Sequence, residues 1–83
     1  MPELSRFYGL VVRMYYDEHP PPHFHGYYQA HQAAIDVDTL EILRGALPRR
    51  ALRLVKEWGL ARQPELRENW RRVEAGEVLL AID

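Results

Sequence analysis

The sequence has no cysteine, only one lysine and no long apolar run. Without cysteine, the chain can form neither a disulfide nor a thiolate metal site. A membrane-spanning helix needs about 20 consecutive apolar residues, and no segment approaches that length. The N-terminus also lacks the charged-then-apolar pattern of a signal peptide. We therefore expect a cytoplasmic protein that does not associate with a membrane.

The composition is that of an ordinary folded domain. Of the 83 residues, 47% are hydrophobic and 28% are charged, which predicts a single domain over residues 1–83. The net charge is −1, and the arginines between residues 49 and 72 alternate with acidic residues, so the molecule is no polycation. A core of this size is marginal, which favours self-association or a small protein partner.

The first half of the chain has the pattern of β-strands. Aromatic and β-branched residues dominate Phe7–Tyr16, and alternation would place Tyr8 and Tyr16 on the core side. A two-residue turn at His31-Gln32 would pair Tyr28 with Ile35 and Tyr27 with Asp36. The further strands expected in this half are Phe24–Ala30, Ala33–Val37 and, after a turn at Asp38-Thr39, Leu40–Leu43, which Gly45 would end.

The second half has the pattern of helices. Pro48 suits a first helical turn, and apolar residues follow at helical spacing. Gly59 and Gln63-Pro64 predict a break before a second helix, Pro64–Ala75, with Gly76 as its C-terminal cap. An apolar segment, Val78–Ile82, predicts a final strand. The expected fold is α+β: a small antiparallel sheet, order β-β-β-β-α-α-β, with both helices on one face. The helical stripes consist of Ala51, Leu54, Val55 and Trp58, then Leu66, Trp70 and Val73.

The sheet face without helices should collect side chains that can carry chemistry. Histidine can act as an acid or base near neutral pH, arginine can stabilise an anion, and tyrosine can stack on bases. Such a face would suit RNA binding or RNA cleavage, although a solvated sheet face is also commonly polar. Three histidines within residues 19–25 are unusual for a solvated face. The catalytic candidates are Arg13, Tyr15, His23, His25 and Asp36, with Tyr27 and Gln29 beside them.

The same histidines predict a possible metal site. His23 and His25 lie on one side of a strand, and His19 would supply a third nitrogen. Asp17 or Asp36 would complete the coordination shell. Zinc or another borderline ion is the expected cofactor of such a site.

Several segments together resemble a bacterial family known as domain of unknown function 4160. They are Ser5–Leu10, Pro21–Gly26, Ile35–Leu43, Leu47–Trp58 and Glu65–Trp70, of which Pro-Pro-His-Phe-His is the most specific. The resemblance implies a small prokaryotic protein, often encoded beside a second small protein, as in toxin–antitoxin pairs. It implies no established catalytic residues.

Three functions therefore follow as hypotheses. The first is a component of a toxin–antitoxin-like pair that acts on RNA or on a partner protein, by general acid/base chemistry if it is an enzyme. The second is a metal-binding domain that uses His19, His23 and His25. The third is a non-enzymatic interaction module, which binds a partner or a second copy of itself.

Overall fold

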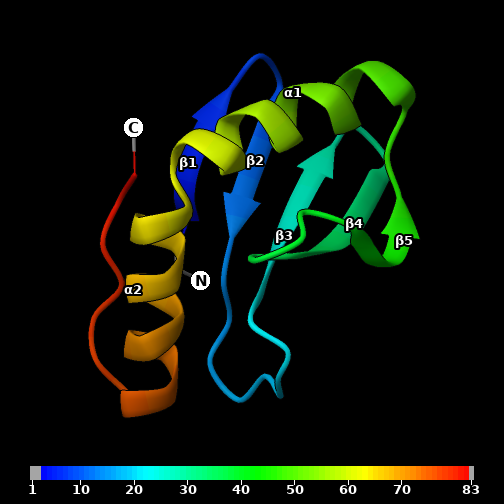
Figure 1. Ribbon diagram of the computed structural model, residues 1–83. Helices are drawn as coiled ribbons and strands as arrows, with labels where there is room; N and C mark the ends of the chain where they lie inside the picture. The colour runs from blue at the N-terminus through cyan, green and yellow to red at the C-terminus, as the bar shows by residue number, and fades with distance from the viewer. Residues whose placement is uncertain (1–2, 83) are drawn as a thin grey trace.

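The computed structural model describes residues 3–82 and has a five-stranded antiparallel sheet followed by two helices (Figure 1). The predicted α+β fold is confirmed, with five strands rather than four before the helices. The strands lie side by side in chain order. The elements are β1 (Glu3–Phe7), β2 (Leu10–Arg13), β3 (His23–Tyr28), β4 (His31–Asp36), β5 (Ile42–Ala46), α1 (Arg49–Ala61) and α2 (Gln63–Ala75).

The predicted strand Phe7–Tyr16 is interrupted by a tight turn. Phe7 pairs with Leu10, and Tyr8 and Gly9 between them have φ values of 48° and 81°. Two positive φ values in a two-residue loop are typical of a type I′ hairpin, which the twist of the paired strands favours. Tyr8 is consequently 80% exposed, and Tyr16, beyond the end of β2, is 38% exposed. The prediction that these two tyrosines are core residues is wrong.

The predicted register of the next hairpin is also wrong. The turn lies at Gln29-Ala30, so that Tyr28 pairs with His31 rather than with Ile35. Gln29 has a φ of 53°, which allows the chain to reverse two residues earlier than expected. The two registers differ by an even number of positions, so both keep the same residues on each face.

The turn after β4 follows the prediction, but the next strand starts later. The Asp36 carboxylate accepts hydrogen bonds from the amides of Asp38 and Thr39, at 2.7 and 2.9 Å. Leu40 stays in this turn with a φ of 61°, so β5 begins at Ile42 instead of Leu40. Gly45 lies inside β5 rather than ending it.

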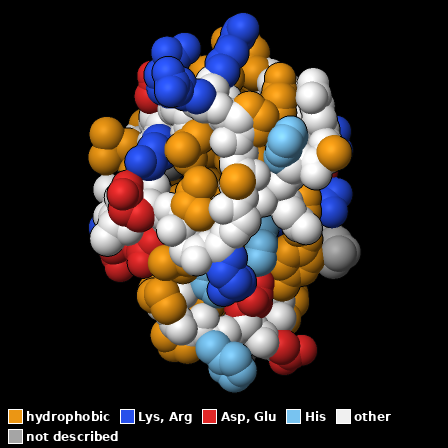
Figure 2. Space-filling model, turned by 90° about the vertical axis from the view of Figure 1, so that its right-hand side faces the viewer, with side chains coloured by type: hydrophobic (Ala, Val, Ile, Leu, Met, Phe, Trp, Pro, Cys, Tyr) orange, Lys and Arg blue, Asp and Glu red, His pale blue; other side chains and the backbone are white. Residues whose placement is uncertain are grey.

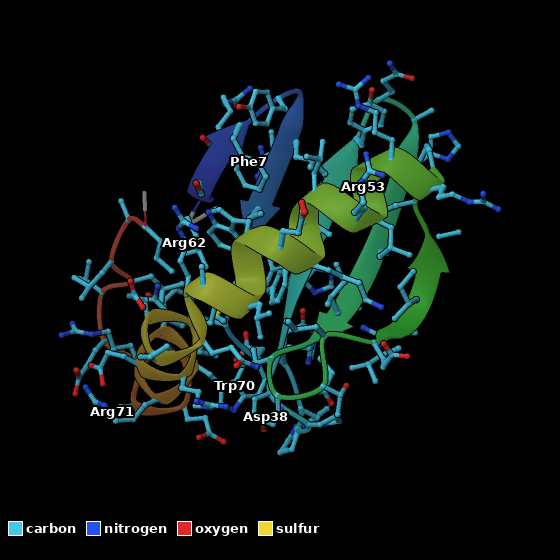
Figure 3. The ribbon with its side chains drawn as sticks, turned by 45° about the horizontal axis from the view of Figure 1, so that its top comes forward. Phe7, Asp38, Arg53, Arg62, Trp70 and Arg71 are labelled. Carbon is cyan, nitrogen blue, oxygen red and sulfur yellow. The ribbon has the colours of Figure 1, made fainter. Side chains whose placement is uncertain are left out.

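Helix α1 crosses one face of the sheet (Figures 1 and 3). The predicted break between the helices lies at Arg62, because α1 continues through Gly59 and ends at Ala61. A Cβ at Gly59 would lie 3.0 Å from Leu40 and 3.6 Å from Phe24, so glycine allows the helix to approach the sheet closely. The cap at Gly76 is confirmed, with a φ of 70°. The core consists mainly of Leu10, Val12, Phe24, Ile35, Val55, Trp58, Leu66 and Trp70.

The predicted last strand, Val78–Ile82, is wrong. Within residues 3–82, no strand follows α2. The tail is held instead by Asn69 of α2, whose amide donates to the Leu80 carbonyl and accepts from the Leu80 amide, both at 2.8 Å. Within residues 3–82, the tail's backbone contact with the sheet is the hydrogen bond from the Ile82 amide to the Leu4 carbonyl, at 2.7 Å.

The surface seen from the side of β5 is mixed in charge (Figure 2). Basic side chains gather mainly at the end where α1 begins, and several histidines lie on the same view. In the part of the chain that the structure describes, neither helix is long and apolar enough to cross a bilayer.

Candidate metal centre

Strand pairing aligns four residues in a row across the open face of the sheet. His25 of β3 pairs with Arg13 of β2 and with Ala34 of β4, and Ala34 pairs with Arg44 of β5. Directly paired residues of antiparallel strands point to the same side. A Cβ at Gly26, on the other side of β3, would contact residues of the α1 side. The row therefore lies on the face away from α1, as predicted for Arg13 and His25.

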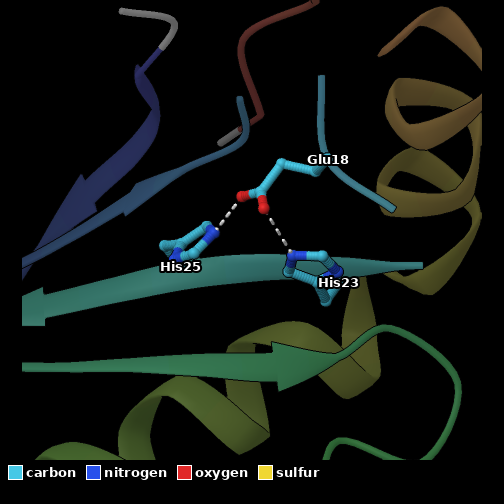
Figure 4. A group of neighbouring side chains, drawn as sticks. All are labelled: Glu18, His23 and His25. Carbon is cyan, nitrogen blue, oxygen red and sulfur yellow. Dashed lines mark hydrogen bonds and ion pairs between the residues drawn. The ribbon is translucent and has the colours of Figure 1, made fainter. Parts of the chain in front are cut away.

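The connection between β2 and β3 brings a carboxylate to two histidines of β3 (Figure 4). Glu18 lies in this connection, residues 14–22. One of its oxygens is hydrogen-bonded to Nε2 of His25, and the other lies 3.4 Å from Nε2 of His23. Each of the three side chains offers one ligand atom, and these atoms lie within 4.8 Å of one another.

The ring of His23 is held in one tautomer. Its Nδ1 lies 2.8 Å from the carbonyl of Pro21, which can only accept a hydrogen bond, so Nδ1 carries the proton of the neutral ring. In this neutral form Nε2 has a lone pair, whereas in the protonated form Nε2 faces Glu18 as an ion pair at 3.4 Å. This atom is buried without a hydrogen-bond partner among the described residues, and the side chain is 3% exposed. Trp70 of α2 packs against the ring at 5.2 Å between centroids. Metal-binding histidines are commonly oriented in this way by a backbone carbonyl.

Glu18 is ionised near neutral pH. Burial alone would raise the pKa of its carboxyl group, but the hydrogen bond to His25 and the charges of His25 and His23 lower this pKa below its ordinary value. Glu18 is therefore a carboxylate, which can accept a hydrogen bond or bind a cation.

A pair of tyrosines adjoins the histidines. The hydroxyls of Tyr15 and Tyr27 are hydrogen-bonded to each other, and the Tyr15 ring lies 4.9 Å from that of His25. Burial and the hydrogen bond to Tyr15 raise the pKa of Tyr27 to about 12, so that this phenol is neutral at physiological pH. The guanidinium of Arg13 lies 5.4 Å from the Tyr27 ring centroid.

The predicted site residues divide into two groups. Arg13, Tyr15 and His25 lie together on the open face. His23 adjoins them but is buried against Trp70 of α2 rather than exposed on that face as predicted. Asp36 is bound to the turn that follows β4 and His19 is exposed, and neither belongs to the group of possible metal ligands.

Sequence reasoning missed Glu18, because it considered only Asp17 and Asp36 as carboxylate ligands. The contact of Glu18 with β3 depends on the path of an irregular connection, which residue alternation does not describe. The available signal was its position immediately before His19 and the three prolines, a stiff segment that feeds directly into β3.

A comparison with known protein families identifies one that matches this chain. The model of a family described as a domain of unknown function (DUF4160) matches residues 9–71. The chain belongs to the DUF4160 family. No curated protein and no solved structure matches it. The DUF4160 match includes Arg13, Glu18, His23, His25 and Arg44, so the whole row and all three possible ligands lie within the family domain.

Proposed function

We propose that this DUF4160 protein binds one divalent transition ion through Glu18, His23 and His25. The observation that carries the proposal is the buried Nε2 of His23, which makes no hydrogen bond among the described residues and faces a carboxylate that also binds His25. A buried nitrogen without a partner is costly unless something binds it. A metal ion would satisfy it.

The spacing of the ligand atoms supports this proposal. Metal–ligand bonds of about 2.0–2.1 Å place neighbouring ligand atoms of a tetrahedral site about 3.4 Å apart. The distance between Nε2 of His23 and the nearer Glu18 oxygen is 3.4 Å. An ion between them would replace the direct contact of His25 with Glu18 by two bonds to the metal. It would also displace the proton shared by that pair.

The types of ligand restrict the ion and its chemistry. Imidazole nitrogens suit zinc, iron, cobalt, nickel and copper, whereas magnesium and calcium prefer oxygen alone. Two histidines and one carboxylate leave coordination positions open for water or another ligand, as in catalytic metal sites. The side chains of His25 and Glu18 are 16% and 23% exposed, so an external ligand would approach from their side.

Titration of tag-free protein with Co²⁺ and Zn²⁺, followed by absorbance and calorimetry, tests the proposal. We expect one ion per chain. Glu18→Gln and His25→Ala should weaken binding at least about tenfold, since each removes a ligand. His19→Ala and His31→Ala remove exposed histidines outside the group and should bind as the wild type does. Less than about a tenth of an equivalent bound, or equal losses in His19→Ala and His25→Ala, would refute the metal site.

We propose as a second candidate that this face acts on RNA within a cytoplasmic, bacterial toxin–antitoxin-like pair. The observation that favours it is the placement of Arg13 and Tyr15 beside a histidine whose orientation Glu18 fixes. Such a histidine can serve as a general base. Induction of the protein alone should then arrest growth, and His25→Ala should relieve the arrest. Full toxicity of His25→Ala would contradict this role.

A further inference from the structure

A small hollow of about 250 Å³ lies beside His25 on the open face. In the row across the sheet, only the methyl group of Ala34 stands between His25 and Arg44. The short side chain leaves room between an imidazole and a guanidinium. The hollow is lined by His25, Gln32, Ala33, Ala34, Arg44 and Gly45.

Of the two arginines in the row, Arg44 lines the hollow and Arg13 does not. Arg44 is exposed, and among residues 3–82 the ion pairs use other basic residues. Arg13 has a buried Nε without a hydrogen-bond partner in the same range. The acidic neighbour of Arg13 on β1 is Glu3, which is held by Arg6 at 2.8 Å.

We propose that an oxyanion binds in the hollow between His25 and Arg44 and occupies an open coordination position of the ion held by Glu18, His23 and His25. This inference rests on the metal site proposed above. Arg13 lies one strand away from His25, and Arg44 lies two strands away on the opposite side. Neighbouring strands are about 4.8 Å apart. Arg44 lines the hollow beside His25, whereas the guanidinium of Arg13 lies over the Tyr27 ring on the other side.

The chemistry of the site selects the ligand class. The planar fork of arginine matches the oxygens of phosphate and carboxylate, and both groups also coordinate transition ions. A drug-sized ligand needs a pocket of about 300–1,000 Å³. The smaller hollow suits the anionic group of a substrate rather than a whole organic molecule. The expected ligand is therefore a phosphoryl or carboxylate group, with the remainder of its molecule outside the hollow.

Co²⁺-loaded protein offers a direct test, because ligands that join the coordination sphere change the absorption of cobalt. We expect a saturable spectral change with inorganic phosphate or with acetate. A tighter response to phosphate would assign a phosphoryl ligand, and a tighter response to acetate would assign a carboxylate. Arg44→Ala should weaken anion binding about tenfold and leave Co²⁺ affinity unchanged, since it removes a charge-assisted hydrogen bond but no metal ligand.

Two matched variants separate charge from space. Arg53→Ala changes the net charge as Arg44→Ala does, but on α1, in the helical layer (Figure 3). This variant should bind the anion as the wild type does. Ala34→Val keeps all charges but fills the hollow, and should weaken anion binding. Bound Co²⁺ with a spectrum that neither anion changes, or equal effects of Arg44→Ala and Arg53→Ala, would overturn this inference alone. A protein that binds no Co²⁺ would overturn the metal site as well.

Discussion

The attachment of the C-terminal tail gives a prediction whose size follows from the structure. Asn69 is 1% exposed, and its side chain makes two hydrogen bonds of 2.8 Å to the backbone of Leu80. Asn69→Ala removes both bonds. Leu80 is 47% exposed, so we expect water to replace the two lost hydrogen bonds to its backbone.

The expected loss is therefore that of two ordinary hydrogen bonds. Each contributes about 0.5–1.5 kcal/mol, so the free energy of unfolding should fall by about 1–3 kcal/mol. In a domain of this size, each kcal/mol lowers the melting temperature by roughly 4–8 °C. Urea denaturation measures the loss, and hydrogen exchange of the Leu80 and Ile82 amides reports whether the tail is released.

Gln63→Ala is the matched control for this prediction. Gln63 also lies on α2 and donates to two backbone carbonyls, those of Val37 and Asp38, at 2.9 and 3.0 Å. Its loss should leave the Leu80 and Ile82 amides protected. The reasoning is refuted if Asn69→Ala leaves the exchange of these amides unchanged, or if its stability lies within about 0.5 kcal/mol of the wild type.

Two further predictions concern glycine and charge. Gly45→Ala should lower the free energy of unfolding by more than about 2 kcal/mol, because its Cβ would lie 2.3 Å from the Gln32 carbonyl oxygen. Gly76→Ala has open space around it and should lower this free energy by only about 1–2 kcal/mol, the cost of its positive φ. Equal losses in urea denaturation would contradict this. Hydrogen bonds from Arg71 and Arg72 lower the pKa of Glu68 from 4.5 to about 2. Glu68→Gln should therefore lower stability above pH 4.5, and its difference from the wild type should vanish as the pH falls through 2. A difference in thermal unfolding that persists below pH 2 would argue against this.

Residue alternation predicted which face of each strand is buried, but it could not predict where the strands end. Phe24 and Ile35 point into the core and His25 points away from it, as the period-two pattern requires. His23 lies on the same side of β3 as His25 but is covered by Trp70 of α2, which strand alternation does not describe. The turn at Tyr8-Gly9 was missed because tyrosine is unusual at a positive φ, whereas asparagine or glycine would have marked the turn.

The candidate site was predicted only where its residues lie on strands, as Arg13 does on β2 and His25 on β3. The positions of His23 and His25 follow from the pattern of β3. The contribution of Glu18 depends on how residues 14–22 fold back, which no local rule determines. The final segment was misassigned for a similar reason: its apolar residues resemble a strand, but Asn69 captures its backbone before the sheet does.

The three possible ligands come from segments of very different constraint, and this has a kinetic consequence. The histidines belong to a strand paired on both sides, whereas Glu18 lies in a connection without strand partners. An ion would therefore leave through movement of this connection, so its exchange rate and its affinity need not change together. Tyr16 ties the connection to the tail through the Glu77 carbonyl, at 2.6 Å. Loosening the tail at Asn69 should thus speed ion release while all three ligands remain intact.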